Sequence, residues 1–395
     1  MAGRVRTKPT IHLLSVASSC KDLLGRLECG GTSALIRFVQ EAVGERYRVT
    51  GIASLIEAIE NDQRGGRRDD AARARDIQRT FADDNVVAAV ALRGGSWLTR
   101  ILNRIDFDVL KKRRKPLALF GFSELTPLVN IAARFARVRA YYDLTPGFLL
   151  PAMTHYARRH VAGLSGGMQL PSRARKEAPG RPDLDEASAD AFASGWATGR
   201  FRSEFAAFFK DVVSIIEGRG SCRSLTGRLV RGKLPRRTQV IAVGGNLTLL
   251  MPMLASQYAK SLDPKGRWLA IEDFRETPNR IDRMLSALSL SGRLIRYEGI
   301  LLGSFRIGQA DYTEATLACL DQHLRGANTP VVILNEFGHI WPMSPLPLGR
   351  PFELQLDQKR RGSATVNVKV PWSSWSIVPR AKRAVRDEAV CEPRP

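Results

Sequence analysis

The sequence lacks the features that mark membrane, disulfide-bonded and metal-binding proteins. It has no apolar run of about eighteen residues and no apolar segment behind its first residues, so it predicts neither a membrane span nor a signal peptide. Its five cysteines form no CxxC pair and its five histidines form no HExxH motif, which argues against a disulfide framework and a metal site. We therefore expect a cytoplasmic protein without a metal ion, a cofactor or a membrane partner.

Acidic residues are also scarce. The chain has 61 Lys and Arg against 39 Asp and Glu, a formal net charge of +22. The excess lies partly in short clusters without aromatic residues, at positions 111–114, 231–237 and 359–361, a pattern that is not typical of a nucleic-acid platform. We interpret these clusters as solvated faces and expect no nucleic-acid partner. A non-catalytic polyanion-binding protein is the rival interpretation from another functional class.

The length of 395 residues and a hydrophobic fraction of 44% allow two domains. A stretch rich in proline and glycine, from about residue 163 to residue 200, is typical of an interdomain linker with room for a short helix at 185–193. We predict four segments: an N-terminal domain at 1–162, a linker and connecting helix at 163–238, a C-terminal domain at 239–380, and a disordered basic tail at 381–395.

The first domain alternates strand and helix patterns, as in a parallel α/β sheet. Apolar, β-prone runs lie at residues 11–16, 86–92 and 115–120, and a helix pattern lies at 69–81. The second run ends in Arg93-Gly94-Gly95 and the third in Gly121-Phe122-Ser123. Because ligands collect at the carboxyl ends of parallel strands, we expect these two glycine turns to face one crevice.

Ser123 is the first candidate for chemistry. Helical spacing begins directly behind it, so the serine lies in a sharp strand-to-helix turn, beside the positive end of a helix where an oxyanion is favoured. The alternative is an ordinary N-cap serine, with Glu124 in the first turn suiting the helix dipole. The nucleophile elbow of many hydrolases also has a glycine two residues behind the serine, where this chain has Leu125.

The second half contains three further strand patterns that end near polar residues. Residues 240–243 lead to Gly244-Gly245-Asn246, residues 268–271 lead to Glu272, and residues 331–334 lead through a loop to His339. An acid and a histidine are what a serine nucleophile in a facing crevice needs. Each also has an ordinary interpretation, Glu272 as a surface or helix-entry carboxylate and His339 as a structural histidine.

The remaining patterns of the second half are helical or irregular. An amphipathic series from Phe205 to Ile216 predicts a helix, and a second helix follows Glu272 with apolar positions from Ile281 to Leu288. We expect no regular structure in the proline-rich residues 341–352 and a last strand at 365–370.

These elements resemble the LD-carboxypeptidase family of serine peptidases, which includes muramoyl-tetrapeptide carboxypeptidase and the microcin C immunity peptidase. The resemblance is collinear over most of the chain and rests on six spaced elements. In the first half, residues 93–95 are similar to the family's RGG turn and residues 121–124 to its G-[FY]-S-D turn. In the second half, residues 244–247 are similar to its GGNL element and residues 271–285 to its acid segment. Residues 299–305 are similar to its G...G.f segment and residues 338–349 to its histidine element.

The resemblance implies a Ser-His-Glu hydrolase in which Ser123 is the nucleophile, His339 is the general base and then acid, and Glu272 orients His339. It implies oxyanion donors at the backbone of Gly95 and Glu124, with Arg93, Gly94 and Trp97 in the same substrate-binding turn. It further implies an α/β fold, with a Rossmann-like N-terminal domain around a parallel sheet and a C-terminal α+β domain with a barrel-like sheet. The triad would form between the two domains, and a homodimer is expected.

Four departures from the family pattern bear on the substrate. Glu124 stands in place of the family's Asp, Ser96-Trp97 in place of Tyr-Gly, Tyr141-Tyr142-Asp143 in place of HGP, and Ser18 in place of a proline. The triad positions are all present. We therefore expect hydrolysis of an amide next to a free C-terminal carboxylate, with release of D-alanine from a murein tetrapeptide in peptidoglycan recycling. The alternative is an immunity-like peptidase that cleaves acyl- or peptidyl-nucleotides, where Trp97 would stack on a base.

Overall fold

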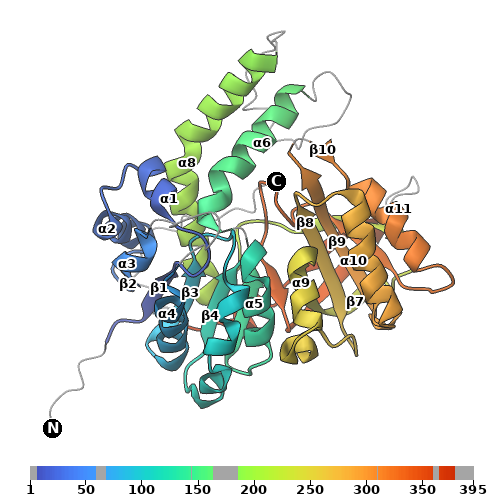
Figure 1. Ribbon diagram of the computed structural model, residues 1–395, viewed down its shortest axis with the longest axis horizontal. Coiled ribbons are helices and arrows are strands. Elements are labelled where there is room, and N and C mark those ends of the chain that lie inside the picture. Colours follow the sequence, from blue (N-terminus) through green and yellow to red (C-terminus); the bar gives the residue numbers. More distant parts are fainter. Residues whose placement is uncertain are drawn as a thin grey trace.

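The computed structural model contains two sheets side by side, with a helical hairpin standing above them (Figure 1). No helix in the described part of the chain is long and apolar enough to cross a membrane. The description covers residues 7–58, 68–143, 145–162, 186–308, 310–358 and 364–378.

The first sheet has six strands in the order β12-β5-β4-β3-β1-β2. Its five N-terminal strands are parallel, and β12 joins the edge antiparallel to β5. Strands β1, β3 and β4 are buried along their whole length, which explains their continuous apolar runs. The strands are β1 (Thr10–Leu14), β2 (Arg48–Gly51), β3 (Val86–Ala91), β4 (Leu117–Gly121), β5 (Val138–Tyr142) and β12 (Leu346–Leu348).

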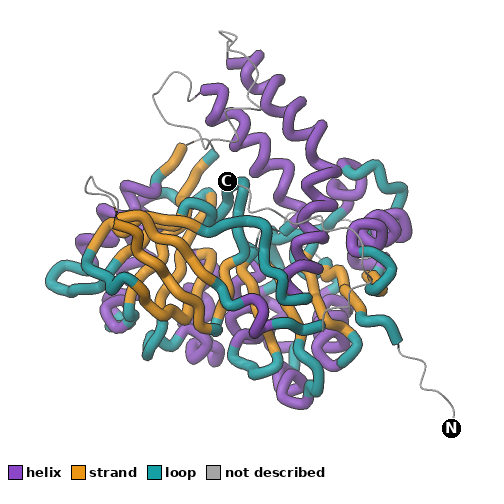
Figure 2. Tube along the Cα trace, turned by 180° about the vertical axis from the view of Figure 1, so that it is seen from behind, coloured by secondary structure: helices purple, strands orange, loops and turns teal. Residues whose placement is uncertain are grey.

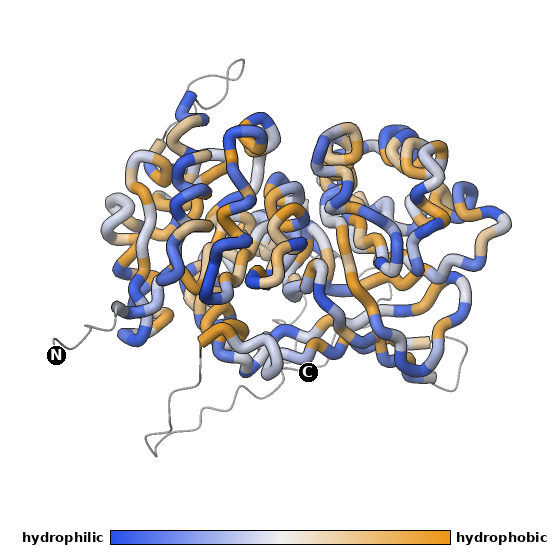
Figure 3. The backbone as a smooth tube through the Cα atoms, turned by 90° about the horizontal axis from the view of Figure 1, so that it is seen from below, coloured by the Kyte–Doolittle hydropathy of each residue, from blue (hydrophilic) through white to orange (hydrophobic). Residues whose placement is uncertain are grey.

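Helices complete this half, and hydrophobic and hydrophilic segments alternate along most of them (Figure 3), whereas α5 is buried at every position. They are α1 (Lys21–Arg26), α2 (Thr32–Val43), α3 (Ala53–Ile56), α4 (Asp70–Ala82), α5 (Thr126–Ala133) and α6 (Leu149–Ala162), with 3₁₀ turns η1 (Thr99–Arg104), η2 (Phe107–Lys112), η3 (Ser123–Leu125) and η4 (Pro146–Phe148).

The second sheet has eight strands in the order β10-β9-β11-β6-β14-β13-β7-β8, and β8 also pairs with β9. This extra pairing closes the strands from β9 to β8 into a barrel, seen from behind in Figure 2. The strands are β6 (Thr226–Arg231), β7 (Arg237–Asn246), β8 (Trp268–Phe274), β9 (Gly299–Ile307), β10 (Ala310–Asp311), β11 (Val331–Leu334), β13 (Pro351–Gln358) and β14 (Ala364–Lys369).

The helices of the second half include α8, which forms the hairpin above the sheets together with α6 (Figure 1). The fold class is therefore as predicted, an α/β domain with a parallel sheet and an α+β part with a barrel. The helices are α8 (Glu186–Ile216), α9 (Leu247–Leu254), α10 (Pro278–Leu290) and α11 (Thr313–His323), with 3₁₀ turns η6 (Gln257–Leu262), η7 (Leu294–Arg296) and η8 (Trp372–Trp375).

Three local predictions differ from the structure. The short helix expected at 185–193 and the helix expected from Phe205 are one helix, α8. Residues 341–352 are not irregular throughout, because β12 lies in them and β13 begins there. The proline of β12 is tolerated because β12 is an edge strand, where a missing N–H leaves no ladder bond unmade.

The predicted division into domains stays a prediction, and three strands do not follow it, among them β7, which begins at Arg237 in the predicted linker segment. Strand β6 lies in the predicted linker segment but pairs with β11 and β14 in the barrel. Strand β12 lies in the predicted C-terminal domain but pairs with β5 in the first sheet. Residues 163–185 of the linker and the tail at 381–395 lie outside the described residues.

Candidate active site

Ser123 stands in a strained turn between β4 and α5. Its φ angle is +56°, in the left-handed region that non-glycine residues rarely adopt. The Ser123 N–H donates to the Tyr142 hydroxyl at 3.1 Å, and its carbonyl oxygen accepts from Thr126 Oγ1 at 2.6 Å. The backbone of the turn is thus held on both sides, which leaves the serine hydroxyl outside the helix.

His339 joins Ser123 to Glu272. Its Nε2 lies 3.3 Å from Ser123 Oγ, and its Nδ1 lies 2.6 Å from Glu272 Oε2. A carboxylate accepts, so Nδ1 carries the proton and Nε2 presents its lone pair to the serine hydroxyl. Ser123 belongs to the first sheet's turn, Glu272 to β8 and His339 to the loop behind β11, so the hydrogen-bonded chain spans both halves.

The second oxygen of Glu272 is also occupied. Glu272 Oε1 accepts from the Tyr142 hydroxyl at 2.7 Å and from Asn246 Nδ2 at 3.4 Å. Burial and the neighbouring Glu272 raise the pKa of Tyr142 well above its ordinary value, so the phenol stays a neutral donor. Tyr142 therefore connects the nucleophile's backbone with the carboxylate that holds His339.

Aromatic rings fix the imidazole from several directions. Phe274 stacks on His339 with ring centroids 4.9 Å apart at 11°, while Phe122 and Phe148 contact it at 4.3 and 5.1 Å. His339 is only 6% exposed and Glu272 is fully buried. These contacts exclude water from the Glu272–His339 pair and limit rotation of the ring, which a general base needs.

The loop that carries His339 lies directly on β9. Gly338 has a φ of +114°, and a Cβ on it would come within 2.4 Å of Ser304 Oγ. Only glycine therefore fits at this position without a shift of β9. This close approach brings His339 over the end of β8 that carries Glu272.

The RGG turn lies against the nucleophile. A Cβ on Gly94 would lie 3.1 Å from Ser123 Cβ, and the Gly94 carbonyl accepts from Ser18 N–H at 3.2 Å. Gly95 has a φ of +116° and is exposed. The turn therefore packs Gly94 against Ser123 and Gly95 against Ser18, and the oxyanion donor expected at the Gly95 N–H stays a prediction.

Glu124 is buried and holds the segment behind the RGG turn. Its Oε1 accepts from the N–H groups of Leu98 and Thr99 at 2.9 and 3.3 Å. Burial raises its pKa to about 7. The longer side chain is thus accommodated by backbone contacts, and its own N–H lies directly behind the nucleophile.

Arg93 and Trp97 contact other parts of the chain. Arg93 donates to the Ser19 carbonyl at 2.8 Å and pairs with Asp22. The Trp97 ring lies under the Arg100 guanidinium at 5.1 Å, and its backbone has a φ of +80°. Among the described residues, no hydrogen bond or ring contact of Trp97 reaches the Ser123–His339–Glu272 chain. Arg93 and Trp97 thus support the turn, and their predicted part in substrate binding stays a prediction.

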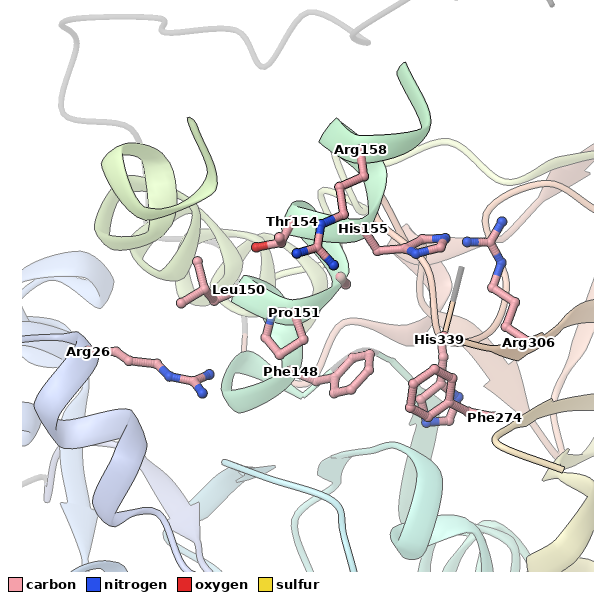
Figure 4. Close-up of a pocket in the computed structure, with 12 residues that line it drawn as sticks. Arg26, Phe148, Leu150, Pro151, Thr154, His155, Arg158, Phe274, Arg306 and His339 are labelled. Carbon is pink, nitrogen blue, oxygen red and sulfur yellow. The ribbon is translucent and has the colours of Figure 1, made fainter. Parts of the chain in front are cut away.

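A cavity of about 330 Å³ opens beside His339 (Figure 4). Phe148 and Phe274 border it together with His339, and helix α6 forms one wall. Its cationic lining residues are Arg26, Arg158 and Arg306. Within the described ranges, no group of His, Cys, Asp and Glu residues could hold a metal ion.

Sequence reasoning missed the residues that support the three central side chains. The sequence marks Tyr142 only as a departure from the HGP element, and that departure is the available signal of a different role. Asn246 stands in the GGNL element, where its amide contacts Glu272. Phe274 lies in the acid segment at 271–285 and Phe148 in none of the six elements, and the contact of either ring with His339 is evident only in the fold.

Known proteins match this chain in both of its halves. The sequence matches the LD-carboxypeptidase N-terminal domain over residues 11–143 and the LD-carboxypeptidase C-terminal domain over residues 240–354. A Streptomyces coelicolor protein named as a carboxypeptidase is 27% identical over 73% of this chain and 75% of its own length. A Bacillus subtilis protein named as a murein peptide carboxypeptidase is 24% identical over the same shares.

Solved structures share the fold. Muramoyltetrapeptide carboxypeptidase from Oxalobacter formigenes has a TM-score of 0.54 at 20% identity, covering 91% of this chain and 99% of its own. The microcin C7 self immunity protein, solved in complex with aspartyl sulfamoyl adenosine, has a TM-score of 0.57 at 16% identity, covering 92% of this chain and 97% of its own. With both family domains matched in order, the chain belongs to the LD-carboxypeptidase family.

Proposed function

We propose that this carboxypeptidase uses Ser123 to hydrolyse an amide next to a free C-terminal carboxylate. The observation that carries the proposal is the continuous hydrogen-bonded chain from Glu272 through His339 to Ser123. It joins an acid, a base and a hydroxyl in the order that nucleophilic acyl transfer requires.

In the first half of the reaction, His339 Nε2 takes the Ser123 proton while Oγ attacks the amide carbon. Glu272 stabilises the imidazolium that forms, and the Gly95 and Glu124 N–H groups receive the oxyanion at about 3 to 4 kcal/mol for each donor. His339 then gives the proton to the departing amine, which leaves an acyl group on Ser123. Water, activated by the same imidazole, hydrolyses this ester and returns Ser123 to its starting state.

A murein tetrapeptide that loses its terminal D-alanine is the substrate we propose first, as part of peptidoglycan recycling. The support is the family and the murein peptide carboxypeptidase named among its relatives. The second candidate is an acyl- or peptidyl-nucleotide. Its support is the basic cavity beside His339 and the aminoacyl sulfamoyl nucleosides found with the immunity protein.

Incubation with a murein tetrapeptide and with an aminoacyl-adenylate analogue, read by mass spectrometry, tests both candidates. The expected result is loss of D-alanine from the tetrapeptide, absent in Ser123→Ala and unchanged by EDTA. Cleavage of the adenylate analogue alone would select the second candidate. Hydrolysis that survives Ser123→Ala would contradict the serine mechanism. The homodimer and the cytoplasmic location stay predictions.

A further inference from the structure

We propose that the cavity beside His339 binds the carboxylate of the departing residue, with Arg306 as its anchor. The inference rests on the proposed function, because it concerns the group that the reaction releases. It adds a binding site and a chemical basis for choosing substrates with a free C-terminus.

The position of the cavity follows from the path of the proton. His339 Nε2 must reach the amine that leaves, so the departing residue lies beside the imidazole. The cavity is bordered by His339 itself, with Phe148 and Phe274 next to it. Its volume of about 330 Å³ suits the residue behind the scissile bond, with apolar walls near the bond and cations farther out (Figure 4).

The charge of the cavity points to an anion. Three guanidinium groups border it, those of Arg26, Arg158 and Arg306, and no Asp or Glu is among the described residues that line it. In Figure 4 Arg26 and Arg306 lie at opposite ends of this view, with Arg158 above His339. The three groups come from α1, α6 and β9, so both halves of the molecule contribute.

The nearby carboxylates do not balance these cations. Asp22 pairs with both Arg26 and Arg93, Asp311 pairs with both Arg159 and Arg306, and Asp190 pairs with Arg158. Five guanidinium groups thus share three carboxylates, which leaves two positive charges without a carboxylate in these pairs. A bound carboxylate would lower that excess in a partly desolvated site, where charge pairing is strong.

Arg306 is the best placed of the three. It is only 3% exposed, and one terminal nitrogen donates to Asp311 at 2.9 Å. Its Nε is buried without a hydrogen-bond partner among the described residues. This Nε has almost no accessible surface, so a ligand in the cavity would meet the terminal nitrogens, whose planar donors match a carboxylate.

Binding to the Ser123→Ala protein measures this site without hydrolysis. The probes are a murein tetrapeptide that ends in D-alanine and the same peptide with a C-terminal amide, both followed by calorimetry. A hydrogen-bonded charge pair predicts about 10- to 100-fold tighter binding of the free acid. Adding Arg306→Gln should reduce this preference to about 3-fold or less, mainly by weakening the acid, whereas a merely structural role would weaken both peptides alike.

Two further variants keep the test decisive. Arg158→Gln changes a guanidinium that is one-third exposed, so it should lower the preference by only about 2- to 5-fold even where Arg306→Gln fails to fold. Arg159→Gln is the matched control, because Arg159 shares Asp311 but does not line the cavity. It should leave the preference unchanged.

Equal binding of acid and amide by the Ser123→Ala protein would overturn the proposal, as would equal losses for both peptides in Arg306→Gln. Binding of AMP but of neither peptide would assign the cavity to a phosphate and also overturn it. A clear acid preference together with hydrolysis that does not need Ser123 would uphold this site and reject the serine mechanism.

Discussion

In the N-terminal half the backbone positions the reactive group, and in the C-terminal half side chains do. Ser123 is placed by a left-handed φ between β4 and α5, with the RGG turn packed against it. His339 lies in a loop and is placed by Glu272 on one edge and by Phe274 and two further rings on its faces. At the site the halves are joined where His339 reaches Ser123 and where Tyr142 reaches Glu272, and Asn130 joins them elsewhere through the backbone of Gly244.

This difference explains which kinds of change each half tolerates. A backbone turn keeps its shape when one side chain is altered, provided that the left-handed residue and the glycines remain. An imidazole held by contacts loses its position when a contact is removed, even though the chain around it is unchanged. Substitutions that compare the two halves therefore test the account.

The largest effect is expected where the halves meet. Ser123→Ala and His339→Ala should each lower kcat by about 10⁴-fold or more, and the double variant should be hardly worse than either single one. The two groups act as one unit, so their losses do not add. Steady-state kinetics on purified variants measures this, and additive losses would show that the halves act separately.

Glu272→Gln should leave about 10- to 100-fold more activity than Ser123→Ala. The amide keeps the imidazole in place in part, but it no longer stabilises the imidazolium. The same kinetic measurement applies, with a melting curve to exclude unfolding. A loss of kcat equal to that of Ser123→Ala would contradict this expectation, because it would mean that the amide does not keep the imidazole in place.

Glu124→Gln should change the pH dependence of stability rather than the fold. The pKa of Glu124 is raised from 4.5 to about 7 by burial, so the native state binds a proton more tightly than the unfolded chain. Its contribution is present below pH 4.5 and is lost as pH rises to about 7, by roughly 3 kcal/mol.

Glutamine keeps an acceptor for Leu98 N–H without this loss. Denaturant melts at pH 4 and pH 8 should show equal stability at low pH and a more stable variant at high pH. Asp273, whose pKa burial raises to about 6, leaves some slope in the variant. A variant that is less stable at pH 8 would contradict the assignment.

Tyr142→Phe should lower kcat by about 10-fold and leave KM nearly unchanged. It removes the hydroxyl that accepts from Ser123 N–H and donates to Glu272, so both halves lose a positioning contact. Tyr141→Phe is the matched control, because the Tyr141 ring is next in the sequence and also buried but stacks on Phe120. Equal losses in the two variants would point to packing instead of positioning.

Trp97→Gly should have the smallest effect on stability, within about 1 kcal/mol. Glycine relieves the left-handed φ of +80° while the cation–π contact with Arg100 is lost, and these terms nearly cancel. The ratio of kcat/KM between tetrapeptide and nucleotide substrates should change clearly, whereas the melting temperature should change little. A large loss of melting temperature with unchanged ratios would make Trp97 structural only.

Local patterns predicted β1, β3 and β4, three of the six strands in the sheet that carries Ser123. Apolar runs ending in glycine turns mark β3 and β4 because buried parallel strands are apolar throughout. The strands before Glu272 and His339 were also recognisable, as β8 and β11. These features depend on residues that are neighbours in the sequence, so they can be predicted from the sequence alone.

The remaining parts depend on partners distant in the chain. Strand β12 pairs with β5 about two hundred residues earlier, and no local pattern reports such a pairing. The link between Tyr142 and Glu272 spans 130 residues. Proline in β12 looks unfavourable by local rules, and only the assembled fold shows that β12 is an edge strand and that the Tyr142 hydroxyl reaches Glu272.

Trapping of the acyl-enzyme tests the central claim most directly. The protein is treated with a substrate analogue that acylates serine and is released only slowly, and the adduct is then located by digestion and mass spectrometry. We expect one adduct, on Ser123. The adduct should be absent in Ser123→Ala and should form far more slowly in His339→Ala, because the base from the other half is then missing. An adduct on another residue, or full hydrolysis without any adduct, would contradict the account.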